Sequence, residues 1–185
     1  EVECEVSEEE LTAGMFADIP EEDPGTANIE PELKDKKGDD VKKGGRRMLG
    51  GATLAEIKGE DSVAVTSASA ITGEGLENDR SRNPANLRQV LVMDKETLDE
   101  FKLIPGQIKE NITTTGLDLS NIQPGNVFFV GDNVTLEATG LCDPCHKMDV
   151  IEDGLQAALD GKRGILSIVL NGGTFNVGDS IRVEP

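Results

Sequence analysis

Two of the chain's three cysteines and its only histidine fall within five consecutive positions: Cys142, Cys145 and His146. Thiols and imidazole bind soft metals, and a thiolate is also a nucleophile. The spacing is therefore compatible with a zinc site, a reversible disulfide, a thiol that carries sulfur, or a plain turn. Zinc needs four ligands, and two adjacent ligands suit one tetrahedral ion poorly. His146 is either an acid or base beside Cys145 or a solvated ring.

Polar residues interrupt an apolar segment well before this loop. Arg88 and Gln89 lie within L-R-Q-V-L-V-M at 87–93. A cation within an apolar strand is costly unless it faces a polar pocket. Three small hydrogen-bonding residues either help Arg88 to hold an anion or satisfy the backbone of strands and turns: Asn111, Thr113 and Thr114. The other arginines available to an anion pocket, or to surface ion pairs, are Arg80, Arg82 and Arg163.

The composition limits the partners of this 185-residue chain. Its formal net charge is −18, which argues against nucleic acid and anionic membrane surfaces because both attract basic proteins. Its unbroken runs of large apolar residues are far shorter than the roughly 20 residues of a membrane-spanning helix. An odd number of cysteines, two of them close together, is not typical of a secreted disulfide framework, so we expect a cytoplasmic protein.

The chain divides into two segments of different texture. Residues 1–57 carry dense acidic runs, a basic cluster and few apolar positions without a steady period. Such a segment does not readily offset the entropy lost on ordering, so we expect it to be disordered or loosely packed. Cys4 lies in it and receives no role. Residues 58–185 are expected to form the folded domain.

The second segment has the pattern of strands separated by turns. Residues 126–140 predict two strands joined at Gly131-Asp132-Asn133, which is a hairpin signal. The sequence V-G-D recurs at 130–132 and 177–179, and we interpret this as shared turn chemistry rather than duplication. Further strands are predicted at 62–71, 87–93, 164–173 and 180–184.

Only two short helices are expected. One follows an Asp94 cap and places Leu98 and Phe101 on one face. The other runs from Ile151 to Leu159 with apolar residues four positions apart. Strands spaced by turns with few helices predict a mainly β fold, specifically a closed or half-closed barrel of bent strands.

Several motifs in order resemble the MOSC domain, the C-terminal module of molybdenum-cofactor sulfurases that also occurs as small standalone proteins. The resemblance covers residues 62–185, and its most specific part is E-N-I-T-T-T-G-L-D-L at 110–119, followed by P-C at 144–145. The supporting motifs are G-E-G-L-E-N-D-R at 73–80, N-L-R-Q-V-L-V-M at 86–93, Q-P-G-N-V-F-F-V-G-D at 123–132 and R-G-I-L-S-I-V-L-N-G-G-T-F-N-V-G-D-S-I at 163–181.

The resemblance implies that Cys145 is the functional thiol, which either carries sulfur as a persulfide or ligates molybdenum. It implies a molybdenum cofactor held with the help of Arg88, Asn111, Thr113 and Thr114. The implied activity is an oxidoreductase, acting on N-hydroxylated compounds, or a sulfurtransferase. A sulfur donor or an electron-transfer protein is the implied partner, and the family is also associated with pyridoxal phosphate binding.

Two positions depart from the usual family pattern. Asn78 stands where the family usually has glycine, and asparagine tolerates left-handed backbone. Cys142 stands where an arginine is common, three residues before Cys145. Cys142 therefore either resolves a persulfide on Cys145 as a redox partner or fills space. The rival to an enzyme is a non-catalytic module that carries the cofactor to, or interacts with, a partner enzyme.

Overall fold

A computed structural model describes residues 53–185, which form a mainly β domain with three short helices among the described residues. Strand β1 (Thr53–Lys58) crosses the predicted boundary at residue 57, and the expectation for residues 1–52 lies outside the described residues. No helix within 53–185 is long and apolar enough to cross a membrane. The remaining strands are β2 (Asp61–Val65), β3 (Ser67–Ile71), β4 (Gly75–Leu76), β5 (Val90–Asp94), β6 (Ile112–Thr114), β7 (Val127–Val130), β8 (Val134–Leu141), β9 (Ile165–Asn171), β10 (Gly173–Asn176) and β11 (Ile181–Glu184).

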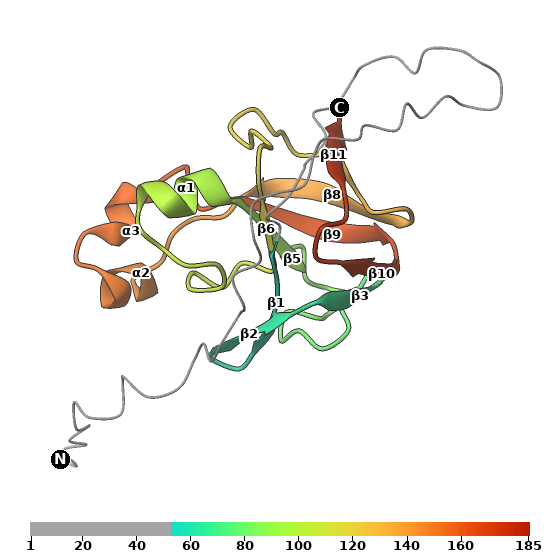
Figure 1. The fold of residues 1–185 in the computed structure, drawn as a ribbon, viewed down its shortest axis with the longest axis horizontal. Coiled ribbons are helices and arrows are strands. Elements are labelled where there is room, and N and C mark those ends of the chain that lie inside the picture. The colour runs from blue at the N-terminus through green and yellow to red at the C-terminus, as the bar shows by residue number, and fades with distance from the viewer. Residues whose placement is uncertain (1–52) are drawn as a thin grey trace, which may run out of the picture. The chain divides into compact units, whose positions relative to one another are not determined.

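The strands form two sheets, as Figure 1 shows. The larger sheet has the order β11-β7-β8-β9-β5-β6-β1-β2, and the smaller has the order β10-β3-β4. Every pairing is antiparallel except β5 with β6, which run parallel. The larger sheet ends at β11 on one side and at β2 on the other within the described chain. The mainly β prediction is confirmed, whereas the closed or half-closed barrel is not, because hydrogen bonding leaves both sheets open.

The predicted hairpin is confirmed. Strands β7 and β8 pair up to Val130 opposite Val134, and the turn between them starts at Gly131 with φ of 58°. The two V-G-D turns lie against each other, because Gly131 donates its N–H to the Ser180 carbonyl at 2.8 Å. A side chain at Gly131 would place its Cβ 2.9 Å from Asp179 Oδ2. The recurrence therefore reflects two turns packed at one edge.

The segment predicted as one strand at 62–71 divides into two. Strand β2 pairs with β1 in the larger sheet, whereas β3 pairs with β10 and β4 in the smaller. The interruption falls at Thr66, whose carbonyl accepts a hydrogen bond from Val177 N at 2.9 Å. The chain therefore leaves one sheet and enters the other at this residue, and period-two alternation does not reveal such a change of sheet.

The first predicted helix is confirmed as α1 (Lys95–Glu100). The Asp94 side chain accepts the Thr97 N–H at 2.7 Å, which satisfies an N–H that has no partner within the helix. Leu98 is fully buried and Phe101 packs against the same cluster. An aspartate cap followed by an acidic first turn was therefore sufficient to predict where this helix begins.

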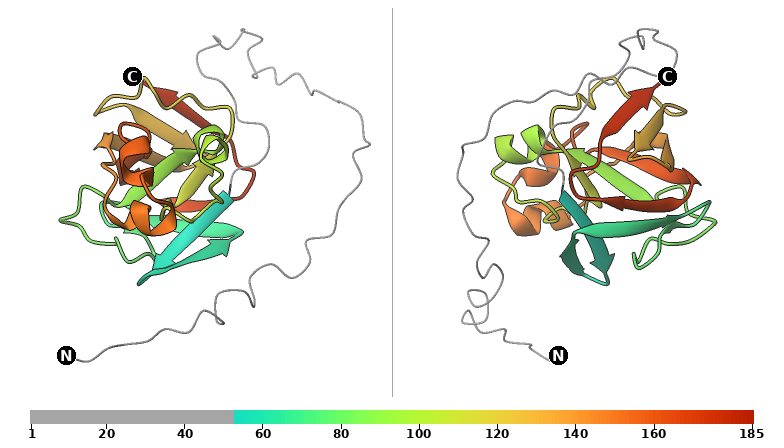
Figure 2. Two further views of the ribbon diagram at one scale, coloured as in Figure 1. Left: turned by 90° about the vertical axis from the view of Figure 1, so that its left-hand side faces the viewer. Right: turned by 45° about the vertical axis from the view of Figure 1, so that its right-hand side comes forward.

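The second predicted helix is wrong as a single element. Two shorter helices occur, α2 (Lys147–Ile151) and α3 (Leu155–Ala158), and Gly154 separates them with φ of 83°. A left-handed glycine ends helical hydrogen bonding. The apolar face was predicted correctly, because Leu155 and Leu159 are buried with Leu98 of α1. The three helices gather on one side of the sheets (Figure 2).

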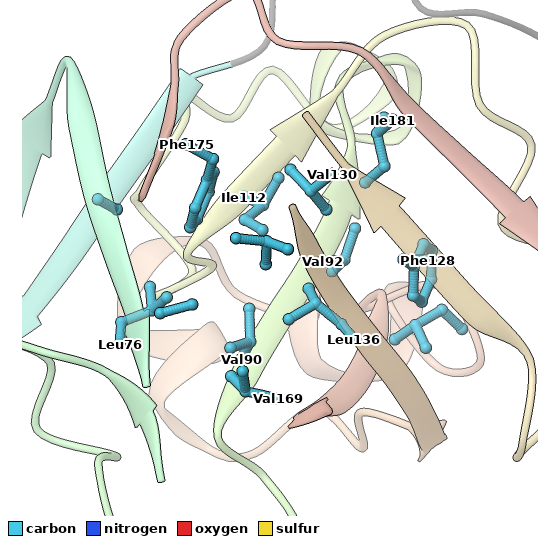
Figure 3. Packing of buried hydrophobic residues seen from close by; sticks show 14 of the residues in the cluster. Leu76, Val90, Val92, Ile112, Phe128, Val130, Leu136, Val169, Phe175 and Ile181 are labelled. Atoms are coloured by element: carbon cyan, nitrogen blue, oxygen red, sulfur yellow. The ribbon is translucent and has the colours of Figure 1, made fainter. Parts of the chain in front are cut away.

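The main core fills the space between the two sheets. Phe175 from the smaller sheet and Phe128 from the larger are both fully buried within it. Figure 3 shows these rings with Val92, Ile112 and Leu136 pointing into the same interior. A second cluster lies under the helices. With only five phenylalanines and no other aromatics, aliphatic residues supply most of the buried surface.

Strand β1 generates a prediction about truncation. Leu54 and Ile57 are buried, and the Ile57 N–H donates to Asp79 Oδ2 at 2.7 Å. A chain that begins at Thr53 should unfold cooperatively, whereas one that begins at Gly59 should lose at least about 3 kcal/mol, since each buried side chain contributes roughly 1.5–3 kcal/mol. Urea unfolding of both proteins measures this difference. Equal stability would show that β1 contributes nothing.

Candidate functional site

A cationic cavity of about 220 Å³ lies where the chain after β4 meets the ends of β8 and β9. Its lining includes four cations, one carboxylate and one thiol: Arg80, Arg88, Lys109, Arg163, Asp79 and Cys142. The chain as a whole is strongly acidic, so a local excess of positive charge is unusual for it. A cavity of this charge favours an anionic ligand.

Arg163 is the most deeply buried cation of the cavity, at 8% exposed. It donates to two backbone carbonyls, those of Asp143 and Ile108, each at 3.1 Å. Its Nη1 also lies 2.9 Å from Cys142 Sγ, and its Nε has no hydrogen-bond partner among the described residues. No carboxylate in residues 53–185 forms an ion pair with it, although buried charges are normally paired.

Arg88 approaches the same sulfur from the turn that precedes β5, whereas Arg163 approaches it from the turn that precedes β9. Its Nη2 lies 3.6 Å from Cys142 Sγ, and its side chain is exposed on the outer side. Asn86 shapes this turn, because its Oδ1 accepts the Arg88 N–H at 2.9 Å and its Nδ2 donates to the Arg88 carbonyl at 3.1 Å. Strand β5 begins only at Val90, so Arg88 precedes the strand rather than interrupting it.

The other two cations have partners outside the cavity. Arg80 donates to the Gly59 carbonyl and forms an exposed ion pair with Glu60. Lys109 donates to the Glu60 carbonyl. Lys147, Arg80 and Lys109 together lower the pKa of the Glu60 carboxyl, the first through a direct hydrogen bond. Arg80 and Lys109 are therefore directed toward Glu60, whereas Arg88 and Arg163 are directed toward the thiol.

Cys142 is 2% exposed and packs between Leu91 and Leu166. Burial raises the pKa of its thiol, whereas Arg163 and Arg88 act in the opposite direction. The thiol is therefore protonated at rest, with two guanidinium groups positioned to stabilise any negative charge that develops on or beyond the sulfur.

Gly164 couples the Arg163 turn to Cys142. Its φ is 84°, and a Cβ there would collide with the backbone carbonyl of Val92. Its own carbonyl accepts the Cys142 N–H at 3.0 Å. Only glycine can adopt this backbone conformation and lie so close to the Val92 carbonyl. Gly164 therefore fixes the position of the Arg163 turn relative to Cys142.

Asp79 is the hydrogen-bonding centre beneath the cavity. Its carboxylate accepts from Ile57 N at 2.7 Å, from Ser81 N at 2.8 Å and from Ser81 Oγ at 2.5 Å. It also accepts from Asn111 Nδ2 at 2.7 Å. All its lone pairs are directed at the protein, so Asp79 positions the site rather than binding a ligand. The sequence motif contained Asp79, but no role was predicted for it.

Asn111 lines the cavity but has little left to offer a ligand. Its Nδ2 donates to Asp79 and to the Ala55 carbonyl, and its Oδ1 accepts the Leu91 N–H at 2.9 Å. The side chain thus bridges β1 and β5 where β6 begins. Asn78, the other departure noted above, does not adopt a left-handed backbone.

The two threonines and Gln89 do not line the cavity. Thr113 is buried and contacts Glu110, and Thr114 donates to the Met93 carbonyl at 3.2 Å. Gln89 donates to the Gly73 carbonyl at 2.7 Å and accepts the Val169 N–H at 3.0 Å. The Thr114 contact satisfies the backbone, which is the alternative that the sequence left open, whereas Thr113 bonds to a side chain.

Cys145 and His146 lie on the loop that follows Cys142, outside the cavity lining. Cys145 is half-buried and its thiol is free. His146 is exposed and immediately precedes α2, with its carbonyl accepting the Asp149 N–H at 3.1 Å. No cluster of three or more potential metal ligands among His, Cys, Asp and Glu occurs in residues 53–185. The structure brings Arg88, Asn111 and Cys142 together, without Cys145.

A larger cavity of about 530 Å³ lies elsewhere and contains no thiol or arginine. Its charged lining includes three acids and one lysine: Asp94, Glu96, Asp118 and Lys162. That charge disfavours an anionic ligand, so the smaller cavity is the better candidate despite its size.

Fold and site together define a small mainly β protein with a cationic, thiol-lined cavity. The profile of the MOSC domain matches residues 79–182, more than half of the chain, and the chain therefore belongs to the MOSC domain family. No curated protein sequence matches it.

Solved structures share its fold at low sequence identity. The YuaD protein from Bacillus subtilis is 19% identical, with a TM-score of 0.63 over 75% of this chain and 97% of that one. YiiM from Geobacillus stearothermophilus is 18% identical, with a TM-score of 0.59 over 76% of each chain. YiiM from Escherichia coli is 20% identical, with a TM-score of 0.54 over 74% and 71% of the two chains.

The Asp79 network generates a stability prediction. Asp79→Ala leaves the Ile57 N–H and the Asn111 amide without their acceptor, and each unsatisfied buried group costs roughly 1–3 kcal/mol. We expect the free energy of unfolding to fall by about 3 kcal/mol, measured with urea. Asp160→Ala is a suitable control, because Asp160 is an exposed aspartate outside this network. A loss below about 1 kcal/mol would contradict the central role of Asp79.

The neighbouring Glu110 generates a pH prediction. It is 1% exposed, its Oε2 has no hydrogen-bond partner in the described chain, and burial raises the pKa of its carboxyl. An acid with a raised folded-state pKa stabilises the fold while protonated, fully below about pH 4.3, and this contribution is lost as pH rises through the folded value. The stability of Glu110→Gln relative to the parent should therefore rise with pH, measured by urea unfolding at several pH values. A difference independent of pH would contradict this.

Proposed function

We propose that this MOSC protein binds an anionic molybdenum cofactor or carries sulfur, with Cys145 as the functional thiolate. The observation that best supports this is the cationic cavity that abuts the C-D-P-C loop. Arg88 and Arg163 carry positive charge without a carboxylate partner in residues 53–185, and a phosphate or an oxyanion would supply the missing negative charge.

The residues fit the anionic end of such a cofactor. Guanidinium groups bind phosphate with two or more charge-assisted hydrogen bonds, and the exposed Arg88 side chain is one such group at the cavity. The cavity volume of about 220 Å³ is below the roughly 300–1,000 Å³ of pockets that enclose a whole ligand. Arg88 and Arg163 would thus hold a phosphate-bearing end, and the rest of the cofactor would lie across the open side.

The chain itself keeps Cys145 in the neighbourhood of a ligand held in this way. It is three residues from Cys142, so the two Cα atoms lie within roughly 11 Å of each other even in an extended chain. When bound, a molybdenum centre supplies two-electron redox chemistry, which suits reduction of N-hydroxylated compounds. The protein itself contributes a soft thiolate and the charge that fixes the anion. An electron-transfer protein or a sulfur donor is the proposed partner.

Serine substitutions separate the two thiols. Cys145→Ser should lower the molybdenum bound per chain at least about tenfold, because an alcohol is a harder and much less acidic ligand than a thiol. Cys142→Ser should retain most of the metal. Elemental analysis of both proteins, purified alike after expression with molybdate, makes the comparison.

Fragment-ion mass spectrometry of the same unreduced samples tests whether the protein carries sulfur. We expect sulfane sulfur on Cys145 of the parent protein. Unchanged molybdenum in Cys145→Ser together with no sulfur on Cys145 in the parent would overturn the proposal. Cofactor binding without turnover of an amidoxime, with electron donors added, would instead identify a carrier that acts with a partner enzyme.

A further inference from the structure

The function proposed for Cys145 leaves the other thiol of the cavity unexplained. Cys142 Sγ lies 2.9 Å from Arg163 Nη1 and 3.6 Å from Arg88 Nη2. Arg163 is more than nine-tenths buried, lines the cavity and has an unpartnered Nε within the described chain. An unsatisfied buried donor beside an uncompensated charge indicates that an anion completes the site.

We propose that Cys142 is a second sulfur-accepting thiol, and that its donor is a small anion carrying sulfane sulfur on a sulfonate group, the thiosulfate class. This inference rests on the proposed function, in that it takes the protein to carry sulfur. It names a different residue from Cys145 and a specific class of donor.

Size, charge and the position of the sulfur support this class together. The cavity of about 220 Å³ is large enough for a small tetrahedral anion. A sulfonate can accept hydrogen bonds from Arg88 and be attracted by the buried charge of Arg163 while its outer sulfur faces Cys142. A neutral donor would leave both charges uncompensated and would gain nothing from them.

The reaction balances without an external oxidant or reductant. The Cys142 thiol first loses its proton to solvent. The thiolate sulfur then forms a bond to the outer sulfur of thiosulfate, and the bond from that sulfur to the sulfonate breaks with its electron pair remaining on sulfite. A thiolate and a dianion thus become a persulfide anion and a dianion. The two guanidinium groups stabilise the persulfide, whose charge lies one atom further into the cavity.

A matched pair of alkylating agents tests the anion preference on the full chain. Iodoacetate is anionic and iodoacetamide is neutral, and they transfer groups of nearly equal size. The ratio of the iodoacetate rate to the iodoacetamide rate should be at least about tenfold higher at Cys142 than at Cys145, because a cationic cleft concentrates anions. Peptide mass spectrometry assigns each rate to its cysteine.

Thiosulfate itself tests the acceptor. Incubation of the full chain should release one sulfite per chain and add one sulfur atom to Cys142. Cys142→Ser should abolish this release, and Cys145→Ser should retain it. A buried serine at position 142 can disturb folding, so a second variant, Arg88→Gln, changes an exposed side chain instead. In this variant, the thiosulfate concentration that gives the half-maximal rate of sulfite release should rise about ten- to a hundredfold.

Arg82→Gln is the matched control. Arg82 is exposed, pairs with Glu74 and does not line the cavity, so its removal changes net charge equally without changing the site. An equal loss in Arg82→Gln and Arg88→Gln would overturn the proposal. Sulfur added only to Cys145 would also overturn it, while leaving the proposed role of Cys145 intact. Sulfur on neither cysteine would overturn it too, and the molybdenum measurement would then decide the proposed function separately.

Discussion

The hydrogen bond between the Asp79 carboxylate and the Asn111 amide is the contact on which the arrangement of this domain depends. Strand β6 is short, and it lies between β1, with which it is antiparallel, and β5, with which it is parallel. Asn111 bonds to both of these neighbours just before β6 begins, and Asp79 fixes Asn111 from below. The same carboxylate orders the turn that leads from β4 toward Arg88. One buried polar network thereby sets the distance between the two sides of the cavity.

The residues of the recognisable motifs divide into those that position and those that can react. Asn111 and Thr114 use their polar groups on the protein itself. Arg88 and Arg163 also lie in motif segments, at 86–93 and 163–181, and they carry the charge of the site that no carboxylate in residues 53–185 pairs. The motifs of this chain therefore contain both residues that satisfy the backbone and residues that can meet a ligand. A buried network tolerates few substitutions, because every change leaves a polar group without a partner.

Local chemistry made some elements predictable. An aspartate cap identified α1, and a glycine-centred turn identified the β7–β8 hairpin. The division of residues 62–71 between two sheets, and the break at Gly154, depend on tertiary contacts that no local period encodes. The site was predictable only in part. Arg88 and Cys142 were both singled out, but their convergence on one cavity joins turns that are 54 residues apart. The resemblance directed attention to Cys145, whereas the geometry gives the deeper position to Cys142.

The pairing of β5 with β9 has a consequence for synthesis on the ribosome. Val90 pairs with Ser167, which follows it by 77 residues, so the centre of the larger sheet cannot close until β9 has been made. The α1 turn and the β7–β8 hairpin are local and can form early. Folds dominated by such distant pairings form slowly, because loop closure precedes the contacts that offset it. The nascent domain must therefore keep its apolar strands apart until β9 emerges, and the high negative charge of the chain opposes association of these unfinished molecules during that interval.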